Sequence, residues 1–195
     1  HQHYAVIGHD RGGRVAHRLA RDYREHVPAL AVLDIAPTLD MYEATDMRFA
    51  MSYYHWFFLT QPAPLPEQLI GADAEFYLER KLGHWGKTPD AHTPEAVAEY
   101  KRCFRQPATI HASCEDYRAA SSIDLDHDRE DRDQMLDIPV LALWGEKGFV
   151  GKKFDVLSIW RAYAHNVSGH GVPGGHFLPE EAPEETLAAL QAFLA

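Results

Sequence analysis

Cysteine is scarce in this 195-residue chain, which contains only Cys103 and Cys114. Two cysteines are too few for a disulfide framework, so the sequence favours a reducing, cytoplasmic location. We also expect no signal peptide and no membrane span, because no apolar run reaches the required length of about 18 residues. Internal repeats and low-complexity tracts are absent as well.

Positively charged residues are also in deficit. The chain contains 19 Lys and Arg but 29 Asp and Glu, which gives a net charge of −10. This balance argues against nucleic acid or an anionic membrane surface as a main partner. An anionic substrate would therefore need a local basic patch. The 46% hydrophobic and 25% charged residues are ordinary for a globular protein, and the length suits one sizeable core.

Strand-like and helix-like segments alternate at both ends of the chain, which is typical of an α/β fold with a parallel sheet. The expected strands are 4–8, 30–35, 139–145 and 165–172, with helices over 13–26 and in the tail from 180. On the first helix, Val15, Leu19 and Tyr23 recur at helical spacing. On the tail helix, Leu187, Leu190 and Leu194 share one face.

The middle of the chain has a different character and predicts a helical cap inserted between two strands of the sheet. It is rich in aromatic residues and is interrupted by the proline-containing breaks 61–67 and 86–95. A charge run over 124–134 is expected to be a solvated return segment. The predicted organisation is therefore core over 1–38, cap over 39–136, and core again over 137–195.

The segment "VIGHDRGGR" carries the first chemical signal. Its frame Gly8-His9-Asp10-Arg11-Gly12 matches the G-x-S-x-G nucleophile elbow, with aspartate in place of serine. A carboxylate can displace halide from an sp³ carbon and form an ester, which water must then hydrolyse with a general base. The alternative interpretation is that Asp10 only caps the following helix.

The base is expected to be a histidine late in the chain, because this fold orders its groups as nucleophile, acid, histidine. His176 in "GGHFLPEE" follows the last strand, whereas the neighbouring His165 and His170 lack that strand-end position. The acid that orients the base lies at one of two strand ends. Both Asp34 and Glu146 suit the role on position alone.

Arg11 and Arg14 follow the nucleophile and project to about the same side of the turn. Two guanidinium groups there can hold a substrate carboxylate with the reacting carbon in line with Asp10. A surface ion pair between Arg14 and Asp22 or Glu25 is the alternative.

Taken together, "GHDRGGRVAHRLA", "LDIAPT", "YYHWFFLTQPAPLPE", "CEDYRA", "LWGEKGFVG" and "GGHFLPEE" resemble the fluoroacetate (haloacetate) dehalogenases of the α/β-hydrolase fold. The resemblance implies Asp34 as the acid, Arg11 and Arg14 as carboxylate ligands, and a small halogenated carboxylate as substrate. It implies a halide pocket of His55, Trp56 and Tyr117, with Trp85 as a further lining candidate. A homodimer is also implied. Displacement and hydrolysis require neither a metal ion nor an organic cofactor.

The chain departs from this family at its start, since His1 lies just before the elbow strand. We therefore expect an apolar edge strand, and no counterpart of the earlier loop that donates one of the two oxyanion hydrogen bonds. Either the chain is part of a longer enzyme or another chain completes its core. An epoxide hydrolase using Tyr53, Tyr54 or Tyr117 and a non-catalytic fragment are the alternative functions.

Overall fold

The computed structural model describes all residues from 1 to 195 and contains one parallel sheet of four strands. The strands are β1 (Val6–His9), β2 (Leu30–Leu33), β3 (Leu136–Gly145) and β4 (Ala164–Val172), in the spatial order β1-β2-β3-β4. The predicted α/β fold is therefore confirmed. β1 forms one edge of the sheet, and its Ile7 is 44% exposed.

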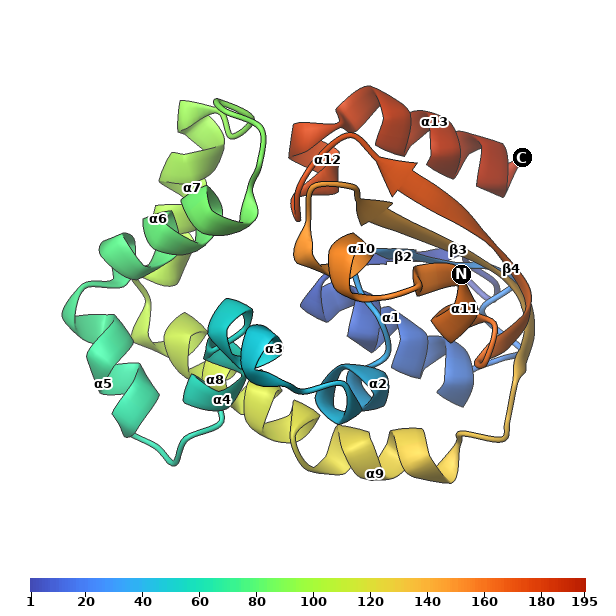
Figure 1. Cartoon of the computed structure of the whole chain (residues 1–195), viewed down its shortest axis with the longest axis horizontal. Helices are drawn as coiled ribbons and strands as arrows, with labels where there is room; N and C mark the ends of the chain where they lie inside the picture. Colours follow the sequence, from blue (N-terminus) through green and yellow to red (C-terminus); the bar gives the residue numbers. More distant parts are fainter.

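Helices cover both faces of the sheet (Figure 1). On one face lie α1 (Arg11–Asp22), α10 (Phe149–Lys153) and α11 (Val156–Trp160); on the other lie α12 (Leu178–Glu181) and α13 (Pro183–Leu194). Side chains of β2 alternate between the two cores, with Leu30 and Val32 on the α1 face and Ala31 and Leu33 on the α13 face. This alternation follows from the two-residue period of a strand.

The remaining helices follow β2 and precede β3 in the chain. They are α2 (Thr38–Glu43), α3 (Met47–Ser52), α4 (His55–Phe58), α5 (Leu65–Ala72), α6 (Ala74–Trp85), α7 (Pro94–Phe104), α8 (Pro107–Ala120) and α9 (Ile123–Glu130). Helices α3 to α8, hereafter the cap, stand beside the sheet, and α9 runs back below it (Figure 1). The cap has its own aromatic core around Phe49, Trp56 and Tyr117. No helix of the chain combines the length and apolar character needed to cross a membrane.

Two expected helix faces are only partly right, because Leu19 and Leu190 pack against the core but their expected partners do not. On α1, which ends at Asp22 rather than His26, Val15 is 62% and Tyr23 50% exposed, while Ala16, His17 and Ala20 are buried. Small side chains allow α1 to approach the sheet closely, so they occupy the contact. On α13 the core contacts come from Ala189, Leu190 and Phe193, while Leu187 and Leu194 remain about half exposed.

Candidate active site

Asp10 occupies a strained turn between β1 and α1, with φ 50° and ψ −122°. Its side chain makes no helix-capping hydrogen bond, which argues against the capping interpretation. A Cβ at Gly13 would lie 2.9 Å from Ile35 Cδ1 and 3.0 Å from the Gly8 carbonyl oxygen, and one at Gly8 would collide with the Gly12 carbonyl. A Cβ at Gly12 would meet nothing within 4 Å. The sharp turn therefore depends on Gly8 and Gly13 rather than on Gly12.

His176 lies between two carboxylates. Its Nε2 is 3.5 Å from Asp10 Oδ2, and its Nδ1 is 2.7 Å from Asp34 Oδ2. Asp34, which follows β2 with φ 52°, also accepts a hydrogen bond of 3.0 Å from the Gly145 backbone N–H. The ends of β1, β2 and β3 thus meet at this edge, as expected for parallel strands. Of the two candidate acids, Asp34 contacts His176, whereas Glu146 packs beside Gly171.

The charges of this group are strongly coupled. Burial opposes protonation of His176, but Asp10 and Asp34 outweigh it and raise the pKa of His176 to about 10. The enclosed position of Asp10 disfavours its charge, yet His176 holds the pKa of Asp10 well below its usual value. The two groups therefore stabilise each other's charged forms, and removing the Asp10 charge would lower the pKa of His176.

The two arginines after Asp10 are both held by other groups. Arg11 pairs with Asp116, donating from Nη2 to Asp116 Oδ1 at 3.1 Å, and its guanidinium stacks 4.7 Å from the Tyr117 ring. Arg14 Nη1 donates to the Ala36 carbonyl and Thr38 Oγ1 at 2.8 and 3.0 Å. Each arginine nevertheless keeps one buried nitrogen without a partner in the chain, Arg11 Nη1 and Arg14 Nε.

The three cap residues expected to form a halide pocket lie together. The His55 ring is 5.6 Å and the Trp56 ring 6.0 Å from the Tyr117 ring. Burial holds the pKa of His55 well below and that of Tyr117 well above their usual values, so both rings are neutral and can donate hydrogen bonds. His55 Nδ1 is buried without a partner. Trp85 contacts both the cap and the catalytic candidates, because its ring lies 4.7 Å from that of His55 and 5.5 Å from that of His176.

A cavity of about 460 Å³ connects the core to the cap. From the core it is lined by Asp10 and Arg11, and from the cap by residues that include His55, Trp85 and Tyr117. Arg14 and Trp56 do not line it; the Arg14 guanidinium stacks 4.7 Å from the Trp56 ring instead. The structure therefore places the expected nucleophile and four of the six expected contact residues at the cavity wall.

Two further residues of this wall escape the sequence reasoning. Asp116 pairs with Arg11 across 105 positions, and Lys81 lines the cavity from α6. Asp116 lies within the quoted segment "CEDYRA" beside Tyr117, but only Tyr117 was singled out there, and Lys81 lies in none of the quoted segments. A charge at the inward position of a cap helix was the one signal that could have indicated Lys81.

The comparison with known proteins agrees with the fold. A family model for the alpha/beta hydrolase fold matches residues 1–183. The chain belongs to the alpha/beta hydrolase family. It is 42% identical over 195 residues to a fluoroacetate dehalogenase from Burkholderia sp and 34% identical over 194 residues to a soluble epoxide hydrolase from Corynebacterium sp. (strain C12). These matches cover 100% and 97% of this chain, but only 64% and 66% of the two relatives.

Among solved structures, this chain superimposes on an alpha/beta hydrolase from Nostoc sp PCC 7120 with a TM-score of 0.98 and 60% identity. That match covers 100% of this chain and 67% of the other. The two curated relatives carry names for different reactions on small molecules. The comparisons therefore show the family, and the reaction itself is a separate question.

Proposed function

We propose that this hydrolase removes the halogen from a haloacetate, with fluoroacetate as the leading candidate substrate. One observation supports the proposal above all. Three buried nitrogens near Asp10 have no partner in the chain, namely Arg11 Nη1, Arg14 Nε and His55 Nδ1. Unpaired buried donors are costly, and an anion with two negatively polarised ends, bound in the cavity, would satisfy those of Arg11 and His55, which line it. The high similarity to a fluoroacetate dehalogenase adds support.

In the first step, an Asp10 carboxylate oxygen attacks the carbon that bears the halogen. The halide leaves with the electron pair of the carbon–halogen bond, and an ester of Asp10 forms. The free Nη1 of Arg11, a residue of the cavity wall, holds the substrate carboxylate and so fixes the direction of attack, and Arg14 adds its positive charge beside Asp10. His55 and Tyr117, which line the cavity, donate hydrogen bonds to the departing halide, and Trp56 packs against Tyr117.

In the second step, His176 takes a proton from water, and the hydroxide attacks the carbonyl carbon of the ester. Esterification has by then removed the Asp10 charge that raises the pKa of His176, so the imidazole becomes an acceptor for this proton. Asp34 orients the ring through Nδ1. The alcohol leaves, Asp10 regains its carboxylate, and one halide and one proton are released per turnover.

The test is the intact mass of His176→Asn after incubation with fluoroacetate, with released fluoride read by electrode. We expect one glycolyl ester on Asp10 and one equivalent of fluoride, because the base for the second step is missing. His165→Asn is a matched control, since His165 is an exposed histidine of β4. It should turn over without accumulating an ester. Fluoride release that persists in Asp10→Ala would refute the covalent mechanism.

Epoxide hydrolysis is a second candidate, supported by the placement of two tyrosines. Burial and then the charges of nearby carboxylates raise the pKa of Tyr53 and Tyr117 well above the usual value, and Asp10 acts on both. Two phenol donors near the nucleophile suit protonation of an epoxide oxygen. Parallel assays of fluoride release from fluoroacetate and diol formation from styrene oxide separate the two. Diol formation without fluoride release would favour the epoxide reaction.

A further inference from the structure

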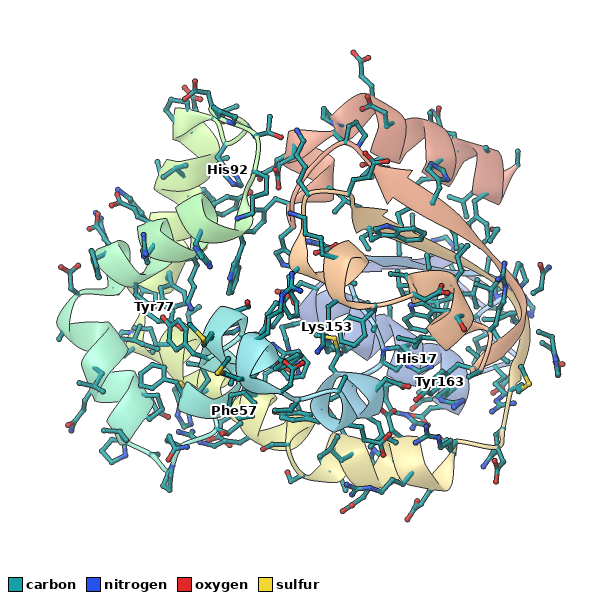
Figure 2. The ribbon with its side chains drawn as sticks, viewed as in Figure 1. His17, Phe57, Tyr77, His92, Lys153 and Tyr163 are labelled. Carbon is teal, nitrogen blue, oxygen red and sulfur yellow. The ribbon has the colours of Figure 1, made fainter.

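Lys81 is the one lysine of the chain that is buried, with 8% of its surface exposed. It projects from α6 into a group of three aromatic rings. Its ammonium nitrogen lies 4.1 Å from the Tyr54 ring centre and 5.0 Å from those of Tyr77 and Trp85. Figure 2 shows Tyr77 on the cap side of the molecule. Aromatic faces attract the charge but accept the ammonium hydrogens only weakly.

No carboxylate of the chain compensates this ammonium. Burial and the neighbouring Arg80 lower the pKa of Lys81 to about 8, and no acidic group acts to raise it. Acidic residues are nevertheless at hand on the same helix. Glu75 and Glu79 pair instead with Lys101 of α7. Lys81 thus faces inward as a charge with no fixed counterion, an arrangement that a bound anion would stabilise.

The open side of Lys81 faces the active-site cavity. Lys81 lines the same cavity as Asp10 and Arg11, from the wall formed by the cap. It lies close enough to His55 for its charge to act on the pKa of that imidazole. In a chain with a net charge of −10, such a local cation attracts anions that the protein as a whole repels.

We propose that Lys81 forms a second anion-binding subsite in this cavity, separate from the Arg11 and Arg14 pair, for a small monovalent anion. The anion has two sources, the carboxylate of an incoming substrate or the halide that leaves the site. The existence of the subsite is independent of the reaction, whereas the identity of its natural occupant rests on the proposed function.

Binding of sodium acetate and of sodium chloride to the 195-residue chain tests the subsite without turnover. We would follow the fluorescence of Trp85 and its neighbours at constant ionic strength. Lys81→Met keeps a long apolar stem but removes the charge, and should weaken binding about tenfold or more. Lys81→Arg should restore it. Arg80→Met removes an equal charge from an exposed neighbour on the same helix and should leave binding unchanged.

The two salts distinguish the sources. Loss of acetate affinity alone assigns the subsite to the substrate carboxylate, and loss of chloride affinity alone assigns it to the halide. If neither salt binds the wild type, or if both bind Lys81→Met and wild type equally, the proposal is refuted. Lys81→Gln provides a second neutral side chain should Lys81→Met not fold, as judged by near-UV circular dichroism.

Kinetics with chloroacetate separates this proposal from the proposed function. If the subsite guides the substrate, Lys81→Met should raise KM about tenfold with kcat within about twofold, and Lys81→Arg should reverse the change. Anion binding that depends on Lys81 in a chain that releases no halide would keep the subsite and refute the dehalogenase. Halide release with unchanged KM and unchanged anion binding in Lys81→Met would support the dehalogenase and refute the subsite.

Discussion

Glu181→Gln should loosen the connection between the cap and the loop that carries His176. The Glu181 carboxylate is buried and accepts four backbone hydrogen bonds. Oε2 accepts from Lys87 and Thr88, which follow α6 of the cap, and from Gly175, at 2.7, 2.9 and 2.8 Å. Oε1 accepts from Phe177 at 2.9 Å. These bonds flank the His176 backbone N–H, which donates to the Trp85 carbonyl at 3.2 Å.

The magnitude follows from these four bonds. Glutamine can place its oxygen at the Oε2 position and keep three of them, but its amide then faces the Phe177 N–H donor. One unsatisfied buried donor costs about 1–3 kcal/mol, and each of the three bonds loses roughly 1 kcal/mol when its acceptor becomes neutral. The easier burial of a neutral side chain offsets part of this sum. We therefore expect Glu181→Gln to lower the free energy of unfolding by about 2–4 kcal/mol.

Urea unfolding at neutral pH, followed by tryptophan fluorescence, measures the effect. Glu184→Gln, on the exposed first turn of α13, is the matched control and should stay within about 0.5 kcal/mol of wild type. Burial raises the pKa of Glu181, but its backbone hydrogen bonds outweigh this and hold the pKa below its usual 4.5. Its stabilisation is therefore present above pH 4.5 and lost as the pH falls through the lowered pKa. A change below about 0.5 kcal/mol at neutral pH would refute this reasoning.

Three further predictions concern the elbow helix and the histidines. Gly13→Ala should destabilise the chain by about 1–3 kcal/mol, because the new Cβ would meet Ile35 and the backbone. Gly12→Ala, whose Cβ would meet nothing, should be neutral or stabilise the chain by up to about 1 kcal/mol. Thermal unfolding compares the two variants. Burial lowers the pKa of His17, which packs against Trp160 and Tyr163 (Figure 2), to about 3. Below pH 6.5 the unfolded chain binds this proton and the folded chain does not, so stability should fall by up to about 1.4 kcal/mol per pH unit, and His17→Phe should flatten that slope in urea titrations. Asp34→Asn should slow ester hydrolysis by roughly 10²- to 10⁴-fold while sparing ester formation, which rapid-quench mass spectrometry would resolve; equal slowing of both steps would contradict its assigned role.

Much of the fold could be predicted because its signals are local. The short apolar runs that become β1, β2 and β3 each carry their own signal, the signal of β4 is weaker, and the glycine frame around Asp10 lies within nine residues. The structure was needed, however, to decide which of these glycines the turn requires. In the elbow motif, Gly12 is the second of the two glycines. The close approach between backbone segments occurs instead at Gly8 and Gly13. Steric contact between segments is not encoded in spacing alone.

Helix faces show the same limit. Val15 and Tyr23 share one face of the expected helix over 13–26, but Ala16 and Ala20 of α1 make the contact with the sheet. Periodicity shows that a helix has an apolar side without showing which neighbour is near enough to bury it. The apolar residues Val15 and Tyr23 remain exposed because no other part of this chain covers them.

By itself, the sequence determined the α/β class, the helical insertion after β2, and an aspartate at the elbow with a histidine far down the chain. Only the tertiary structure decided that Asp34 rather than Glu146 contacts His176, that Asp116 holds Arg11, and that Lys81 enters the cavity without a counterion. The physical reason is that the first group of properties depends on neighbours along the chain. The second depends on distances between side chains as much as 142 positions apart, which exist only once the sheet and cap have packed.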